Sequence, residues 1–216
     1  MPADTRNAAA HPAVGTRVDV MELTLRGARR DLVDGRRYAR YLDIAADGLF
    51  GAMLGSAADE VIANASLRAG TEFDVANAVF AEAAGQVVGM CSGSMTSPDA
   101  GLPLTLRDVG WRAPRAAAVA LWTYPLLSAL TRRDPGEWYL QSIAVDPQVR
   151  GGGVGSMLFA DAIERARTAG ATRLVLDVAD DNPRARALYE RLGMTRQWSS
   201  RRMPLAGQVH RMSMPI

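Results

Sequence analysis

A glycine-rich turn from Arg150 to Ser156, Arg150-Gly151-Gly152-Gly153-Val154-Gly155-Ser156, is the segment best suited to bind an anion. Glycines let a backbone turn tightly and approach a ligand closely. The first N–H groups of a helix have no acceptor inside it, and the helix dipole adds partial positive charge at the same end. If a helix begins here, the turn would bind a phosphate, with the Arg150 guanidinium as a fixed charge at its rim.

Several interpretations of this turn compete. A P-loop requires a lysine, and the chain contains none, so that class is excluded. A dinucleotide-binding fingerprint requires a third glycine, where this chain has Ser156 or Leu158, and it normally follows the first strand of a domain. The pattern Arg-x-x-Gly-x-Gly remains, filled by Arg150, Gly153 and Gly155. Taken alone, it leaves a plain glycine-rich turn as an alternative.

Asp177 is a second candidate, because it interrupts the apolar run Leu174-Val175-Leu176-Asp177-Val178. A run of this kind is typical of a strand in the middle of a sheet. A carboxylate there is costly unless it has a partner or a chemical role.

Composition excludes several other classes of function. The net charge is +2, and no block of like charge suggests a nucleic-acid-binding tail. The single cysteine, Cys91, excludes a disulfide within the chain, and only two histidines are present, so we expect no metal site. The most apolar run, 113–130, contains Arg115 and Pro125 and is shorter than the roughly 20 residues of a membrane span. We therefore expect a cytoplasmic protein without membrane contact.

The elements that must position these residues follow from periodicity and capping signals. Residues 1–16 are expected to be a disordered tail and 17–216 a single domain, with 95–137 as a helical insertion. A helical pattern covers Asp31 to Leu67, with possible stops at Gly55 and Gly70. A further helix is expected from Val154 to Thr168, and another from the N-cap Asn182 to Gly193. Strands are expected at Val18–Leu25, Asn77–Glu82, Gln86–Ser94, Trp138–Val145, Arg173–Val178, Thr195–Ser199 and Gln208–Met214.

Five pieces of sequence carry a family resemblance through their order and spacing. They are Ser142-Ile143-Ala144-Val145-Asp146-Pro147, then Arg150 to Gly155, then Leu176-Asp177-Val178, then Asn182, then Ala187-Leu188-Tyr189-Glu190-Arg191-Leu192-Gly193-Met194. Together they resemble the core of the GNAT N-acetyltransferase superfamily over about a quarter of the chain. The resemblance implies an α/β (α+β) fold with a mixed, mostly antiparallel central sheet flanked by helices, here with a helical insertion.

The resemblance also implies acetyl-CoA as co-substrate, with no metal. Its diphosphate would lie on the N–H groups of Arg150, Gly151, Gly152, Gly153, Val154, Gly155 and Ser156. Its pantetheine arm would pair with Ile143, Ala144 and Val145, and the N–H of Val145 would polarise the thioester carbonyl. Asn182 matches a family asparagine that contacts the pantetheine arm, although a role as helix cap alone is an equal alternative.

For catalysis, Tyr189 matches the family tyrosine that protonates the leaving CoA thiolate, with a core aromatic as the alternative. Asp177 falls where protein N-terminal acetyltransferases of the superfamily carry an acidic base. Glu137, Gln141 as an orienting group, and a chain of waters are rivals for that role.

The resulting expectation is an N-acetyltransferase that moves an acetyl group to a primary amine by direct attack in a ternary complex. The acceptor would be a small molecule or a peptide, and the protein, which could form a homodimer, would bind no nucleic acid. An acetyl-CoA-binding sensor or regulator without turnover is the alternative, and a nucleotide-binding module unrelated to CoA is a second one.

Overall fold

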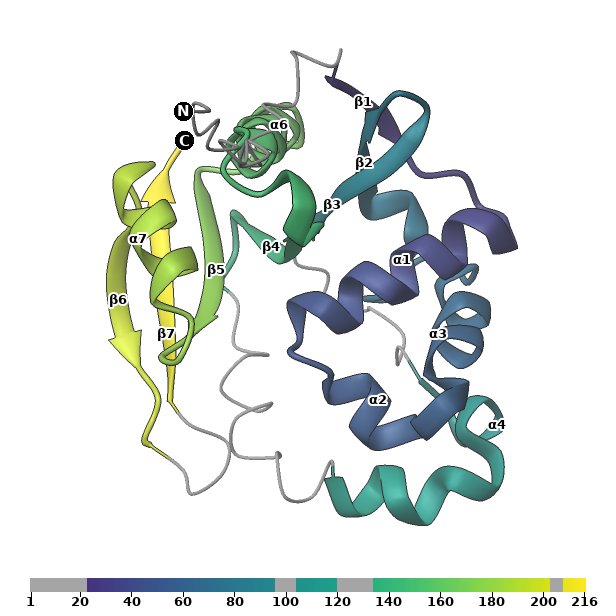
Figure 1. The fold of residues 1–216 in the computed structure, drawn as a ribbon. Coiled ribbons are helices and arrows are strands. Elements are labelled where there is room, and N and C mark those ends of the chain that lie inside the picture. The colour runs from purple at the N-terminus through teal and green to yellow at the C-terminus, as the bar shows by residue number, and fades with distance from the viewer. Residues whose placement is uncertain (1–22, 96–103, 120–133, 203–207) are drawn as a thin grey trace, which may run out of the picture.

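Seven strands form one sheet in the order β1-β2-β3-β4-β5-β7-β6 in the computed structural model, which describes residues 23–95, 104–119, 134–202 and 208–216. Neighbouring strands are antiparallel except β4 and β5, which are parallel. The strands are β1 (Leu23–Gly27), β2 (Ala78–Ala83), β3 (Gln86–Met95), β4 (Glu137–Val145), β5 (Arg173–Ala179), β6 (Thr195–Ser199) and β7 (Val209–Pro215). The predicted mixed, mostly antiparallel sheet is thereby confirmed (Figure 1).

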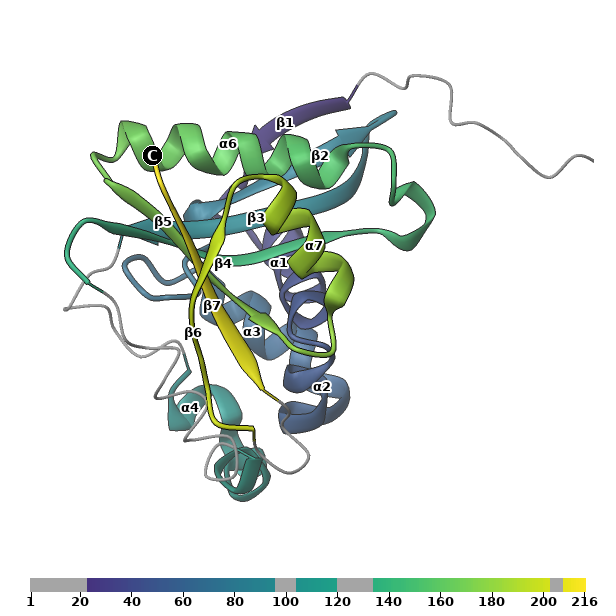
Figure 2. The same cartoon turned by 90° about the vertical axis from the view of Figure 1, so that its left-hand side faces the viewer.

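Helices cover both faces of the sheet. On one face lie α1 (Leu32–Ala45), α2 (Leu49–Leu54) and α3 (Ala58–Ser66), and on the other α6 (Val154–Thr168) with α7 (Pro183–Arg191) beside it (Figure 2). Alternation along the strands divides the apolar side chains between two cores. In β2, Phe80 packs in the core under α1, whereas Val79 and Ala81 pack in the core under α6.

The parallel pairing of β4 with β5 is short, and this positions the site. Only Glu137, Trp138 and Tyr139 pair with β5, the last of them with Val175. Beyond that pair β4 continues along β3 as far as Val145, while β5 continues along β7. We call the point where β4 and β5 part, after Tyr139 and Val175, the fork. Past the fork each strand has one edge without a strand partner.

Local signals place most elements correctly. The β2–β3 hairpin turns through Ala84 and Gly85, both at positive φ. The helical pattern from Asp31 to Leu67 is broken, because Asp47 and Gly48 also adopt positive φ and separate α1 from α2. The first strand begins at Leu23, and the rest of its predicted range lies outside the described residues.

Within the expected insertion at 95–137, the residues that the structure describes are helical from Leu106 to 119, beginning with α4 (Leu106–Val109). Met95 and Glu137 belong to the flanking strands. Residues 96–103 and 120–133 lie outside the described residues, as does the predicted tail at 1–16. In the part of the chain that is described, no helix has the length and apolar character needed to span a bilayer.

Candidate active site

The glycine turn leads directly into α6 and leaves a row of N–H groups unpaired. Gly151 and the N-cap Gly153 have φ values of 86° and 87°, a conformation that favours glycine. The N–H of Gly152 donates to the carbonyl of Val149 at 3.3 Å. Within the described residues no acceptor is found for the N–H groups of Gly151, Gly153, Val154, Gly155 and Ser156. These donors, at the positive end of a 15-residue helix, suit a diphosphate.

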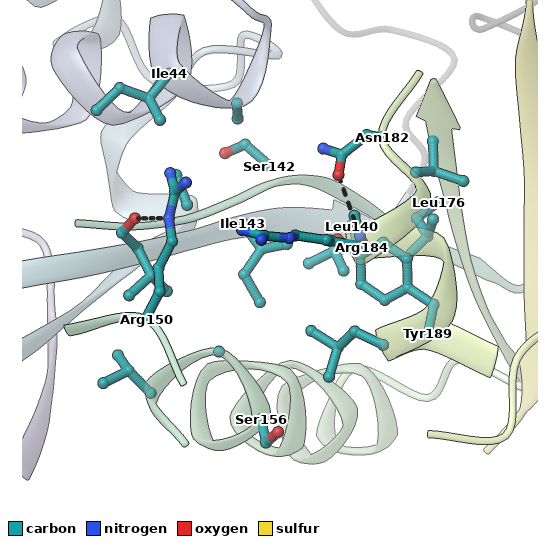
Figure 3. A pocket seen from close by; sticks show the side chains of 18 of the residues that line it. Ile44, Leu140, Ser142, Ile143, Arg150, Ser156, Leu176, Asn182, Arg184 and Tyr189 are labelled. Atoms are coloured by element: carbon teal, nitrogen blue, oxygen red, sulfur yellow. Dashed lines mark hydrogen bonds between the residues drawn. The ribbon is translucent and has the colours of Figure 1, made fainter. Parts of the chain in front are cut away.

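Arg150 fixes the end of β4 next to this turn. Its Nε donates to the carbonyl oxygen of Val145 at 3.0 Å (Figure 3). The next N–H along the chain, that of Asp146, donates to Val88 in the opposite direction, toward β3. Because successive residues of a strand point their N–H groups to opposite sides, the N–H of Val145 faces the open side past the fork.

A cavity of about 860 Å³ connects the turn with the fork. This volume is within the range of ligand sites, roughly 300–1,000 Å³. Its wall contains every residue predicted for the site except Gly152, namely Ile143, Ala144, Val145, Arg150, Gly151, Gly153, Val154, Gly155, Ser156, Asp177, Asn182 and Tyr189. The open edge of β4 and the unpaired N–H groups therefore line one space, as an elongated phosphate-bearing ligand such as CoA requires.

Tyr189 lies on α7, across the cavity from Arg150 (Figure 3). It is 6% exposed, and its ring centroid lies 5.9 Å from that of Phe159 on α6. Burial, and secondarily the proximity of Cys91, raise the pKa of its hydroxyl well above the ordinary value. Among the described residues the hydroxyl has no hydrogen-bond partner, so it is a protonated donor with its hydrogen-bonding capacity free.

Asp177 lines the cavity just past the fork, but both of its carboxylate oxygens have partners. Arg211 donates from Nε to Oδ1 at 3.1 Å and from Nη2 to Oδ2 at 2.8 Å. The Tyr139 hydroxyl donates to Oδ2 at 3.1 Å. The side chains of Asp177 and Arg211 are 4% and 8% exposed, so this is a buried ion pair. A proton taken up by Asp177 would weaken it.

Of the other polar residues predicted for the site, Asn182 and Gln141 lie in the cavity wall and Glu137 does not. Asn182 caps α7 by accepting from the N–H of Ala185 at 3.1 Å, while its amide nitrogen keeps its donors free among the described residues and lines the cavity. Glu137 is buried away from the cavity and accepts from the N–H of Asp134 at 3.0 Å. Gln141 does line the cavity.

Sequence reasoning assigned no role to several residues of the cavity wall. Arg184, in the first turn of α7, extends its side chain into the cavity toward Ile143 (Figure 3). Nothing in the spacing of the motif separates it from Arg186, which instead pairs with Asp180 at 3.4 Å. Ile44, Ala45 and Asp47 enter the wall from the end of α1, far away in sequence.

Comparison with known proteins agrees with this geometry. The profile of the acetyltransferase (GNAT) family matches residues 54–194. Among solved structures, an acetyltransferase is 23% identical with a TM-score of 0.60, covering 89% of this chain and 99% of that one. An N-acetyltransferase from Staphylococcus aureus Mu50 is 14% identical, with a TM-score of 0.62 and coverage of 88% and 100%. The NatC complex bound to Gag peptide and CoA is 15% identical, with a TM-score of 0.56 and coverage of 91% and 99%.

A search of curated proteins finds no match. The structural likenesses show the fold, and the family profile spans well over half of the chain, including the glycine turn, the fork and Tyr189. The chain therefore belongs to the GNAT acetyltransferase family, whose members transfer an acetyl group from acetyl-CoA.

Proposed function

We propose that this protein is an N-acetyltransferase that moves the acetyl group of acetyl-CoA to a primary amine by direct attack in a ternary complex. The observation that carries the proposal is the single cavity that joins the unpaired N–H groups of the glycine turn to the buried hydroxyl of Tyr189. One fold neighbour binds a peptide together with CoA, which supports a peptide amine as an acceptor class.

Acetyl-CoA supplies an activated thioester. The N–H groups of Gly151, Gly153 and the first turn of α6 would hold its diphosphate, and the open edge of β4 at Ile143 to Val145 would pair with the pantetheine arm. Val145 lies beside the glycine turn, within 4 Å of where a side chain on Gly155 would begin. The sequence predicts that the N–H of Val145 polarises the thioester carbonyl. Because Val145 lies so close to the diphosphate site, we propose instead that its N–H bonds the pantetheine arm and that the acyl group lies nearer the fork.

The acceptor would enter from the side of α1. An alkyl ammonium has a pKa of about 10.4 and must lose a proton before its nitrogen can attack. Because Asp177 is held by Arg211, we propose that this proton leaves through water in the open cavity, with Asp177 shaping the fork. Tyr189, kept protonated by burial, would donate its proton to the departing thiolate, and the proton that the attacking nitrogen loses as the amide forms would return to Tyr189 through the cavity water.

Release of free thiol from acetyl-CoA over a panel of amines tests the proposal. The matched variant is Tyr189→Phe, which keeps the packing on Phe159 and removes only the hydroxyl. We expect kcat to fall by about 100-fold or more, with the KM for acetyl-CoA little changed. Tight binding of acetyl-CoA by the wild type without thiol release on any amine would instead favour the sensor alternative.

A further inference from the structure

Gln141 occupies an unusual place in β4. Ser142 pairs with Ser92 of β3 and Leu140 pairs with Gly93, so that Gln141 is an extra residue without a partner, a β-bulge. A bulge turns two successive side chains toward one face. Gln141 contacts Tyr38 of α1, and Ser142 contacts Ser92, while Leu140 and Ile143 pack in the core under α6.

The orientation of the Gln141 amide is set by buried hydroxyl groups. Its Oε1 accepts from the hydroxyl of Tyr38 at 3.0 Å and from that of Ser92 at 3.2 Å. Tyr38 and Ser92 are both fully buried, and burial raises the pKa of Tyr38, which therefore stays a donor. Ser92 and Ser142 share a further hydrogen bond of 2.6 Å. Three hydroxyl protons need acceptors here, and an inward Oε1 accepts two of them.

Because Oε1 of Gln141 faces the buried hydroxyls, its NH₂ group faces the cavity. Gln141 lines the cavity, and its Nε2 has no hydrogen-bond partner among the described residues. The cavity wall includes the apolar side chains of Ile44, Ala45 and Ala144, together with the hydroxyl of Ser142 and the carboxylate of Asp47. A fixed pair of N–H donors binds an oxygen acceptor, and it offers nothing to an ammonium group.

We infer that Gln141 is a specificity-determining residue that donates a hydrogen bond to a carbonyl or carboxylate oxygen adjacent to the amine of the acceptor. This inference rests on the proposed N-acetyltransferase function and narrows its substrate class. The acceptor is an α-amino group next to a carbonyl, as in an amino acid or at the N-terminus of a peptide. A simple alkylamine leaves the Gln141 donors unpaired, and sites with unpaired buried donors discriminate strongly.

The experiment compares three acceptors with the same side chain: a peptide N-terminus, the free amino acid, and the alkylamine that lacks the carbonyl. The variant is Gln141→Glu, which retains an inward oxygen for Tyr38 and Ser92 and replaces the cavity-facing donor by an acceptor. Gln86→Glu is the matched control, because Gln86 is exposed at the start of β3, outside the cavity wall. Binding of acetyl-CoA, measured by calorimetry, reports on an intact fold.

For the wild type and Gln86→Glu we expect kcat/KM to favour the peptide or the amino acid over the alkylamine at least tenfold. Gln141→Glu should lower this preference tenfold or more through the KM for the acceptor, with acetyl-CoA affinity unchanged. The free amino acid should lose more than the peptide, because the carboxylate that the Gln141→Glu substitution introduces also repels the carboxylate of a free amino acid.

Equal use of all three acceptors by the wild type would overturn this inference and leave the proposed function intact. The same holds if Gln141→Glu lowers kcat/KM equally for all three. Failure of the wild type to acetylate any amine would overturn both. If Gln141→Glu loses acetyl-CoA binding, the milder Ser92→Ala, which removes one of the two hydroxyls that donate to Oε1 without altering the amide, should still reduce the preference, and an unchanged preference would overturn the inference.

Discussion

Replacement of Asp177 by asparagine separates a structural role from a role as base. The variant keeps the size of the side chain and an oxygen that can accept from Tyr139, but it removes the charge facing Arg211. In the native protein two hydrogen bonds, of 3.1 and 2.8 Å, join the carboxylate and the guanidinium. Burial works to lower the pKa of Arg211, and the hydrogen bond and charge of Asp177 more than offset it, so the pKa is raised.

The size of the effect follows from burial. With the two side chains 4% and 8% exposed, solvent cannot replace the missing charge. Removing one partner of a buried ion pair costs about 3–5 kcal/mol. Asparagine retains one acceptor for Arg211, so we expect the lower end, about 3 kcal/mol.

The assay is urea unfolding of Asp177→Asn, Arg211→Met and the double variant, with exposed Asp181→Asn as control. The control should stay within about 0.5 kcal/mol of the wild type. The double variant should cost less than the sum of the single ones, because the two residues share one interaction. If Asp177→Asn kept wild-type stability while kcat collapsed, the reasoning would be refuted, and Asp177 would be the base expected from the sequence.

Three further predictions concern other sites. Gly155→Ala should fold, because an added Cβ meets nothing closer than 3.8 Å, yet lower acetyl-CoA affinity at least tenfold in calorimetry, whereas Gly27→Ala, outside the cavity wall and with nothing within 4 Å of its added Cβ, should bind normally. Cys91, whose pKa burial raises to about 12, should resist a thiol reagent at pH 8 and react only in denaturant. Burial works to raise the pKa of Asp34, but hydrogen bonds led by that of Arg26 hold it well below the ordinary 3.8. Asp34→Asn should thus cost about 2 kcal/mol or more at pH 7 in urea unfolding, and this difference from wild type should shrink as the pH falls below about 4.

Elements with local signals could be predicted from the sequence. Gly170 and Gly193 end their helices at φ values of 79° and 93°, and Asn182 caps α7, as their positions in the sequence indicate. The break between α1 and α2 is not evident from the sequence, because Asp47 and Gly48 lie within a continuous helical pattern. The helical pattern alone does not show that the chain must turn at Asp47 and Gly48 for α1 and α2 to cover the same face of the sheet.

Most of the site wall is also predictable, because the glycine turn and its two flanking elements are contiguous in sequence. Gly152 is the exception: its N–H closes the turn onto Val149, and only the fold shows which glycine does so. The fork and the bulge at Gln141 depend on pairing with β3, β5 and β7, which are distant in sequence. No local pattern therefore indicates that Asp177 meets Arg211.

The fork itself explains why this ion pair is needed. Past Val175, β5 loses β4 as a neighbour, so the hydrogen bonds that would hold that edge are absent. Asp177 is the cross-strand partner of Arg211 in β7, and Tyr139, the last β4 residue paired with β5, donates to the same carboxylate. One carboxylate thus connects β4, β5 and β7 at the point of divergence. An apolar residue at position 177 could pack, but it could not hold Tyr139 and Arg211 together. The shape of the cavity therefore depends on the charge of Asp177, even though the proposed mechanism does not use Asp177 as a base.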